Sequence, residues 1–273
     1  MPIRLRLSGD RGRADHGWLK SFFTFSFADY SDSLFDGFGC LRVLNDDTVS
    51  SGGGFPTHSH SNFEIWSYIM SGALEHRDSL GNIETLGRGS VQFTSAGTGI
   101  RHSEFNADKT RDGKGVDVRF LQIWSLPEKR GTTPAYQTGH FSDSEKIDKL
   151  CPILLPAASF TPLKGSGPLA INNSLSMHAS LISPGVTLSL PITSRHLAYV
   201  HCPILPGSSG VSLRCSGDTN AYATTVLHPG DGAFVEGCEG SLLFTGLGSC
   251  GLSSSGGISS TNHTEFVVMH FLK

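Results

Sequence analysis

Charged residues are scarce in this sequence: Asp, Glu, Lys and Arg together make up 16% of its 273 positions. The formal net charge is −3, and no window gathers Lys and Arg into the basic stripe that a nucleic-acid backbone requires. We therefore expect no direct binding of nucleic acid by this chain.

Long apolar runs are lacking as well. The amino-terminal segment has no signal-peptide core, and no stretch of about 18 apolar residues occurs anywhere. We therefore expect neither secretion nor a membrane span, and we predict a cytoplasmic protein, with the nucleus as an alternative location.

Closely spaced cysteines are missing too. The six cysteines are scattered and form no C-x-x-C motif, which argues against a zinc knot and against a redox pair. A chain of this length can bury a core without disulfides, so we expect free and mostly buried thiols.

Glycine, by contrast, is abundant, with 33 residues beside 13 prolines. Many turns and few charged surface helices are typical of all-β proteins. The length favours two domains, and the second half is poorer in charge and richer in Ser and Gly. We place the domains at 1–140 and 141–273, with a short helix in Ser142–Leu150 and a mobile loop at Ser249–Thr261.

Short runs of strand composition recur in both halves, and turn signals separate them. The clearest runs span 40–46, 64–72, 89–97 and 118–126 in the first half, and 179–191, 196–204, 211–217, 224–237, 240–248 and 266–272 in the second. Strands at this spacing predict a sandwich or barrel. We expect an all-β fold of two β-sandwich or jelly-roll barrels in tandem, with little helix.

A weak internal repeat relates the two halves. Tyr68–Gly72 has a counterpart around Tyr199, and Gly87–Phe93 resembles Pro229–Phe234. A duplicated β-barrel accounts for both similarities. The second half has no His-x-His motif, so we expect the second barrel to be degenerate and to lack a metal site.

The candidate site combines two short motifs. His58 and His60 project from the same face of a strand because residues i and i+2 share a face, and the same holds for His102 and Glu104. Three imidazoles and one carboxylate inside one barrel predict a single metal site. This donor set suits one divalent transition metal: Fe(II), Cu, Ni, Zn or Mn.

Three polar residues beside these motifs are open to two interpretations. Glu64 is either a group that supports the ligands or a residue of the strand surface. His76 and Asp78 either brace the ligands by hydrogen bonds or stabilise the turn before Gly81. For the isolated histidines we expect hydrogen-bonded core residues, namely His16, His140, His178, His263 and His270, and His76 in the absence of a bracing role.

Apolar residues near the motifs are candidates to line a substrate pocket. Phe55, Pro56, Phe93 and Phe105 would wall a flat, aromatic substrate, and each is equally well suited to the core. Two open coordination positions on an octahedral metal would make the site catalytic, with Glu104 or a bound water as the base that removes a hydroxyl proton.

The spacing Gly52-x5-His58-x-His60-x3-Glu64-x7-Gly72, followed by Gly89-x5-Ser95-x-Gly97-x4-His102-x3-Asn106, is similar to the two cupin motifs. Four runs resemble the pirin family, most closely its bacterial-type quercetin dioxygenase branch: Asp15–Tyr30, Gly52–Tyr68, Leu74–Asn82 and Ser95–Asn106. The resemblance is dense over residues 10–140 and thin beyond them.

The resemblance implies a bicupin with one metal, usually iron and hence Fe(II) first, held by His58, His60, His102 and Glu104. It implies a metal-dependent dioxygenase that cleaves the ring of flavonols such as quercetin with O2. The alternative it implies is a non-catalytic, redox-sensing iron protein that binds a transcription regulator. In either case we expect a monomer.

Overall fold

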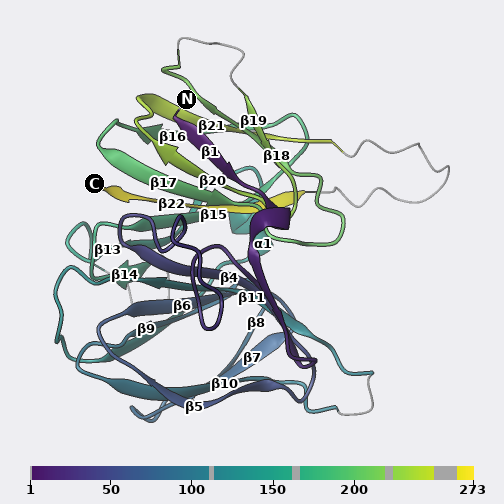
Figure 1. The fold of residues 1–273 in the computed structure, drawn as a ribbon, viewed down its shortest axis with the longest axis vertical. Coiled ribbons are helices and arrows are strands. Elements are labelled where there is room, and N and C mark those ends of the chain that lie inside the picture. The colour runs from purple at the N-terminus through teal and green to yellow at the C-terminus, as the bar shows by residue number, and fades with distance from the viewer. Residues whose placement is uncertain (1, 111–113, 162–166, 219–223, 249–262) are drawn as a thin grey trace. The chain divides into compact units, whose positions relative to one another are not determined.

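The computed structural model describes residues 2–110, 114–161, 167–218, 224–248 and 263–273 (Figure 1). Strands β1 to β22 make up nearly all of its regular structure, beside one α-helix and one 3-10 helix. This confirms the all-β fold with little helix. The expected loop at 249–261 lies outside the described residues.

The chain divides into two compact units, each assembled from separate segments. Unit 1 contains Met1–Asp10, Ser142–Pro152 and Ser176–Lys273, whereas unit 2 contains Arg11–Phe141 and Ile153–Leu175. The chain thus passes from unit 2 to unit 1 after Phe141, while its first ten residues and the segment 153–175 each join the unit formed by the opposite half.

Unit 2 is built from two antiparallel sheets. The larger has the order β12 (Ala135–His140), β9 (Ser90–Ser95), β6 (Glu64–Ser71), β11 (Val118–Ser125), β4 (Leu41–Val49), β3 (Leu19–Phe23) and β2 (Gly12–Asp15). The smaller has the order β5 (Gly54–His60), β10 (Ile100–Asn106), β7 (Ala73–Asp78) and β8 (Ile83–Gly87). Apolar residues from both sheets, among them Val49, Leu74 and Phe120, form a buried cluster. Burial of their apolar surface holds the two sheets together.

Unit 1 repeats this plan. Its larger sheet runs β1 (Ile3–Arg6), β20 (Gly232–Glu236), β17 (His196–His201), β22 (Thr264–Leu272) and β15 (Ser176–Ile182). Its smaller sheet runs β16 (Thr187–Ile192), β21 (Gly240–Gly246), β18 (Val211–Cys215) and β19 (Thr225–Leu227). Strand β13 (Cys151–Pro156) crosses the division between the units and pairs in parallel with β14 (Leu169–Ile171) inside unit 2.

The helical elements are short. The 3-10 helix η1 covers Ser8–Asp10 and α1 covers Asp143–Lys146. Helix α1 starts after Ser142, whose backbone N–H donates to the Glu145 carboxylate at 2.7 Å, as in a capping box. The helix therefore begins where the sequence predicts, but it ends after about one turn.

The sheet orders confirm the duplicated barrel. In unit 2 the order β9-β6-β11-β4 faces β5-β10-β7-β8, and in unit 1 the same positions are held by β20-β17-β22-β15 and β16-β21-β18-β19. Tyr68 on β6 and Tyr199 on β17 thus occupy the corresponding strand of each barrel. The weak repeat in the sequence is a repeat of topology.

The expectation of free thiols is wrong for two of the cysteines. Cys215 at the end of β18 and Cys238 just before β21 form a disulfide, with Cα atoms 5.8 Å apart. They are 23 residues apart in sequence, but β18 and β21 are paired neighbours, so the fold brings them together. Among the described residues, Cys40, Cys151 and Cys202 form no disulfide.

Candidate metal centre

The two predicted motifs lie on paired strands of the small sheet of unit 2. His58 and His60 belong to β5, and His102 and Glu104 belong to the neighbouring strand β10. His102 lies directly opposite His58 in the register, so their side chains share one face of the sheet. A register shift between His102 and Glu104 then places Glu104 opposite Phe55.

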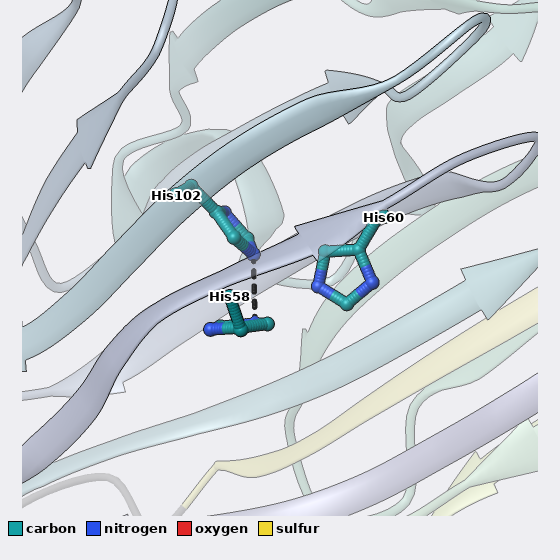
Figure 2. A group of neighbouring side chains, drawn as sticks. All are labelled: His58, His60 and His102. Atoms are coloured by element: carbon teal, nitrogen blue, oxygen red, sulfur yellow. Dashed lines mark hydrogen bonds between the residues drawn. The ribbon is translucent and has the colours of Figure 1, made fainter.

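The three imidazoles converge. Their ring centroids are 4.6 Å apart for His58 and His102, 4.7 Å for His58 and His60, and 4.9 Å for His60 and His102 (Figure 2). The ligating atoms of the three residues all lie within 4.8 Å of one another. Two motifs 44 residues apart in sequence therefore form one cluster of nitrogen donors.

Distances within the cluster fit a metal ion. The Nε2 atoms of His58 and His102 are 3.1 Å apart. Two nitrogens, each about 2.1 Å from one metal and at a right angle, would be about 3 Å apart. The Nε2 of His60 is buried and has no hydrogen-bond partner among the described residues. A bound metal ion would satisfy this nitrogen, so the residues present fit the metal that the cupin motifs imply.

The charge state of the cluster also suits a metal. Burial, together with the neighbouring imidazoles, lowers the pKa of His60 to about 4 and that of His102 to about 3. Both rings are therefore neutral near pH 7 and offer a lone pair. The Nδ1 of His58 lies 2.8 Å from the carbonyl oxygen of Pro56, and donation to that oxygen leaves Nε2 of His58 unprotonated.

Glu104 approaches the same centre from a second group of residues. The ligating atoms of His76, His102 and Glu104 lie within 4.8 Å of one another, so His102 is shared between the two groups. Glu104 is buried, and Nε2 of Gln122 donates to its Oε2 at 3.1 Å. The Ser67 hydroxyl lies 3.0 Å from Oε1 of Glu104. These contacts hold the carboxylate in one orientation.

A cavity of about 340 Å³ opens onto the centre within unit 2. Its walls are formed by His16, Trp18, Leu19, Ser21, Phe23, Phe27, Ala28, Asn45, Asp47, Phe55, His58, Glu104, Gln122 and Trp124. Two predicted ligands, His58 and Glu104, therefore face this space directly. Its size lies within the range of small-molecule sites.

Of the four residues expected to line the pocket, one lines the cavity and three do not. Phe55 lines the cavity and packs edge-on against Trp18, with ring centroids 5.3 Å apart. Phe93 is fully buried beside Trp66 in the core, because it lies on β9 of the large sheet. Pro56 is exposed, and Phe105 lies beneath Gly54 with the Lys109 ammonium 5.5 Å from its ring. These three residues do not line the cavity.

Glu64 supports the fold rather than touching the imidazoles. It is fully buried on β6, where the Ser95 hydroxyl donates to its carboxylate at 2.6 Å and the side-chain amide of Asn172 lies 3.2 Å away. Burial raises the pKa of this carboxyl, and the three hydrogen bonds only partly offset it. Glu64 thus ties β6 and β9 to the segment 153–175.

Asp78 stabilises the turn before Gly81 and also holds His76, whose ring lies beside His102. Nε2 of His76 lies 3.2 Å from Oδ2 of Asp78, and the His76 ring is 5.4 Å from that of His102. Oδ1 of Asp78 also accepts the backbone N–H groups of Leu80 and Asn82, which close the turn before Gly81. Although burial opposes ionisation of Asp78, the hydrogen bonds lower its pKa. One carboxylate therefore fixes both the turn and the ring next to the centre.

The cavity also contains residues that were not predicted from the sequence. Asn45 and Asp47 on β4 and Trp124 on β11 line it, and the Trp124 ring lies 4.7 Å from that of His60. Asn45 Oδ1 and Trp124 Nε1 are buried without a hydrogen-bond partner among the described residues. Trp18 and Phe27 lie in the aromatic run Asp15–Tyr30, so that run was the available signal for part of this wall.

The carboxyl group of Asp47 has a strongly raised pKa. Burial raises its pKa to about 7, and the charges of Asp46 and Glu104 add to this effect, whereas the hydrogen bond from Ser21 opposes it. A carboxyl group with this pKa exchanges its proton near neutral pH. The cavity wall therefore contains two acidic side chains, Asp47 and Glu104, in different environments.

The corresponding positions of the other barrel are apolar. Counting from the paired ends Ile100–His60 in unit 2 and Gly240–Ile192 in unit 1, the counterparts of His58, His60, His102 and Glu104 are Leu190, Ile192, Leu242 and Phe244. All four counterparts belong to one buried hydrophobic cluster. None of these four positions in unit 1 therefore has a His or Glu residue.

Two barrels of one topology, one of them with a histidine-rich centre in its small sheet, define a bicupin. The chain belongs to the pirin family: the family model described as Pirin matches residues 5–125. A putative quercetin 2,3-dioxygenase of Mycobacterium bovis is 37% identical over 189 residues, which are 69% of this chain and 74% of that protein. The resemblance found in the motifs is therefore confirmed.

A sequence comparison and a structure comparison both find similarity to Escherichia coli proteins. A quercetin 2,3-dioxygenase is 49% identical over 139 residues, which are 51% of this chain. The chain matches 58% of the length of that relative. The crystal structure of the bacterial pirin YhhW in complex with nickel(II) aligns with a TM-score of 0.76 and 29% identity, covering 99% of this chain and 98% of that one. Among the described residues of the present chain, no helix is long and apolar enough to cross a membrane.

Proposed function

We propose that this protein is a metal-dependent dioxygenase that cleaves the ring of a flavonol, such as quercetin, with O2. The observation that carries the proposal is the placement of His58 and Glu104 on the wall of an aromatic cavity, beside His60 and His102. Relatives named quercetin 2,3-dioxygenase support the choice of reaction.

The cavity suits a flat phenolic substrate. Trp18, Phe27, Phe55 and Trp124 supply aromatic walls, and Phe27 and Trp124 meet edge to face with centroids 5.5 Å apart. Such rings favour stacked or edge-on contacts with another aromatic system. The unpaired Trp124 N–H would donate to an oxygen of the substrate, and Asn45 Oδ1 would accept one of its hydroxyl groups.

We propose that His58, His60, His102 and Glu104 hold one divalent transition metal. Three imidazoles and one carboxylate suit Fe(II), our first choice, and Ni(II) is the alternative supported by the nickel complex of the YhhW relative. When bound, the metal would supply Lewis acidity at the base of the cavity. We propose that the domain over residues 141–273 has no metal at the equivalent positions.

The proton of the substrate hydroxyl would be taken by a carboxylate of this chain. Glu104 faces the cavity, and Gln122 and Ser67 fix its orientation. Asp47 lines the same cavity with a pKa near 7, which makes it the acceptor to which the proton can pass near neutral pH.

The test is a comparison of iron-loaded and metal-free protein, each mixed with quercetin under air. We expect loss of the flavonol absorbance together with uptake of O2 only in the loaded sample. His58→Ala and Glu104→Ala should each lose metal and activity. His140→Ala is the matched control, because His140 is exposed on β12 and lies outside the cavity.

Two outcomes would contradict these proposals separately. Absence of O2 uptake by fully loaded protein would refute the reaction, whereas full metal occupancy in both alanine variants would refute the ligand assignment. The alternative of a redox-sensing iron protein that binds a transcription regulator stays a prediction, as do the cytoplasmic location and the monomeric state.

A further inference from the structure

A second group of metal donors lies next to the three imidazoles, on the paired strands β10 and β7 of unit 2 (Figure 1). Glu104 is directly opposite His76 in the register, and His102 is two residues from Glu104 on the same strand. Residues opposite each other, or two apart on one strand, point to the same side of a sheet. The three side chains therefore share one face of the small sheet, and all three are buried.

The donor atoms of this second group are close together. One ligating atom from each of His76, His102 and Glu104 lies within 4.8 Å of the other two, which is the same limit that His58, His60 and His102 meet. Two donors that are each about 2.1 Å from one ion are up to about 4.2 Å apart, so the second group has nearly the size of a coordination shell.

One nitrogen of His76 is committed and the other is available. Nε2 of His76 lies 3.2 Å from Oδ2 of Asp78, and both side chains are fully buried. Donation from Nε2 to this carboxylate leaves a lone pair on Nδ1, which is buried and has no hydrogen-bond partner within the described part of the chain. A carboxylate that accepts the other N–H of the ring is the usual support of a histidine ligand.

The orientation of the His76 ring is fixed from two sides. The Tyr136 ring stacks on it, with centroids 4.8 Å apart and an interplanar angle of 16°. On the other side Asp78 is itself held by the backbone N–H groups of Leu80 and Asn82 and by the side-chain amide of Asn82. His76 would therefore lose little side-chain freedom when it binds an ion.

The hydrogen bonds of the first group direct a lone pair of His102 to the second. Nδ1 of His58 donates to the Pro56 carbonyl oxygen, so Nε2 of His58 is an acceptor. Nε2 of His102, 3.1 Å away, then carries the proton between the two rings. Nδ1 of His102 keeps its lone pair, and this nitrogen is buried without a partner among the described residues. An ion that accepts this lone pair would remove the cost of leaving it unpaired.

Two imidazoles and one carboxylate make up the second donor set. This combination, with open positions beside it, is typical of non-haem Fe(II) sites. Glu104 can take part, because Oε2 accepts an N–H of Gln122 and Oε1 lies 3.0 Å from the Ser67 hydroxyl, which leaves each oxygen a further lone pair. The group therefore suits a divalent transition metal.

The other barrel shows that the fold does not need an imidazole at the position of His76. Its counterpart by register is Leu213, which is opposite Phe244 as His76 is opposite Glu104. Leu213 and Phe244 both belong to the buried hydrophobic cluster of unit 1. An apolar residue can thus fill this place, and the four ligands proposed for the first group do not account for His76.

We propose that His76, His102 and Glu104 form a second position for a divalent transition metal in the unit 2 barrel, as an alternative to the first. His76 and His102 bind through Nδ1, and Glu104 binds through one carboxylate oxygen. Because His102 and Glu104 belong to both positions, a single ion occupies one or the other. The second position is the weaker, since it has three donors in place of four, and it empties on dialysis against metal-free buffer.

The test uses Co(II) as the probe and untagged full-length protein in which His58→Ala and His60→Ala remove the first position. Bound metal is measured by equilibrium dialysis over a series of free Co(II) concentrations, with elemental analysis of the protein. We expect one equivalent per chain, bound more weakly than by the parent. Adding His76→Gln should abolish this equivalent, whereas adding Asp78→Asn should weaken its binding at least about tenfold, because the support of His76 is lost.

The matched control adds His140→Gln, because His140 is an exposed histidine on β12 of the same unit. It should leave the equivalent unchanged. The proposal is overturned if the variant without His58 and His60 binds no Co(II), or if the equivalent survives His76→Gln.

Thermal unfolding of each variant without metal shows whether a loss of binding follows from a loss of fold. If His76→Gln does not fold, an unchanged affinity in Asp78→Asn overturns the proposal instead. Because the first position is absent throughout and only binding is measured, the result is independent of the dioxygenase proposal.

Discussion

The two barrels share one strand order but have different residues at equivalent positions of their small sheets. In unit 2 the paired strands β5 and β10 carry His58, His60, His102 and Glu104, whereas the equivalent strands β16 and β21 of unit 1 carry Leu and Ile residues and Phe244. The topology is therefore compatible with either a polar centre or an apolar core at the same place.

The difference shows what a polar centre requires from its surroundings. In unit 2, Ser67, Gln122 and Asp78 provide hydrogen bonds to the residues of the centre or to their neighbours. By register, Val200, Val268 and Cys215 occupy these three positions in unit 1. A barrel has to change its supporting residues together with its ligands, since a buried polar group without a partner is costly.

The largest effect on metal affinity is expected when a histidine of the unit 2 centre is replaced by its apolar counterpart from unit 1. His102→Leu introduces the residue type found at Leu242 and removes the proposed ligand that both groups of donors share. We expect metal affinity and dioxygenase activity to fall by at least about 100-fold. Metal content after dialysis and O2 uptake measure the two effects. His140→Leu is the control, and a full equivalent of metal in His102→Leu would contradict the comparison.

Asp47 offers a test of pH dependence, because its counterpart by register is the uncharged Ser180. Its pKa is raised from 3.8 to about 7, so between these values the native state binds a proton that the unfolded state has lost. Stability therefore falls as pH rises from about 4 to about 7 and is level above that. The difference between the two pKa values corresponds to at most about 4 kcal/mol in the free energy of unfolding.

We therefore expect the free energy of unfolding of metal-free Asp47→Asn to exceed that of the metal-free parent by up to about 4 kcal/mol near pH 8. The two proteins should be about equally stable near pH 4. Urea denaturation at both pH values measures this. Asp15→Asn serves as the control, because Asp15 is exposed. An unchanged difference between parent and Asp47→Asn at the two pH values would refute the assignment.

The reverse exchange should destabilise the second barrel. Leu242→His places an imidazole at the position equivalent to His102, inside a fully apolar cluster. The loss of packing and the burial of an unpaired polar group together cost about 3 kcal/mol. Urea denaturation of Leu242→His is compared with Leu242→Met, which nearly conserves volume. Equal stability of the two variants would show that the apolar filling is not what excludes ligands there.

The sequence was sufficient for the elements whose signal is local. The i, i+2 spacing brought His58 and His60 to one face, and the same strand logic applied to His102 and Glu104. Spacing alone does not define a site, because His263 and Glu265 have the same His-x-Glu spacing, yet Glu265 lies 3.9 Å from the Lys146 ammonium. The duplicated barrel was readable because both halves repeat short strands at similar intervals.

What the sequence did not disclose depends on contacts between distant strands. The disulfide joins Cys215 on β18 to Cys238 just before the neighbouring strand β21. Asn45, Asp47 and Trp124 meet in the cavity only because β4 and β11 pair. Phe93 looked like a wall residue near the motif, but β9 belongs to the other sheet and its side chain is in the core. Sheet partners, and hence facing residues, follow from tertiary pairing rather than from local composition.

The smallest effect concerns the support of Glu104. Gln122 donates to Oε2 of Glu104 at 3.1 Å, and its counterpart by register is Val268, so Gln122→Val gives the first barrel the residue of the second. All four proposed ligands remain, and only the orientation of the carboxylate is released. We expect a 10- to 100-fold loss of metal affinity, about 1.4 to 2.7 kcal/mol, measured by competition with a chelator.

Gln137→Val is the control. It removes hydrogen bonds to Ala170, which is not in the cavity wall, and should leave metal affinity unchanged. Equal affinities of the two variants would mean that the ligands alone, without their supporting residues, distinguish the barrels.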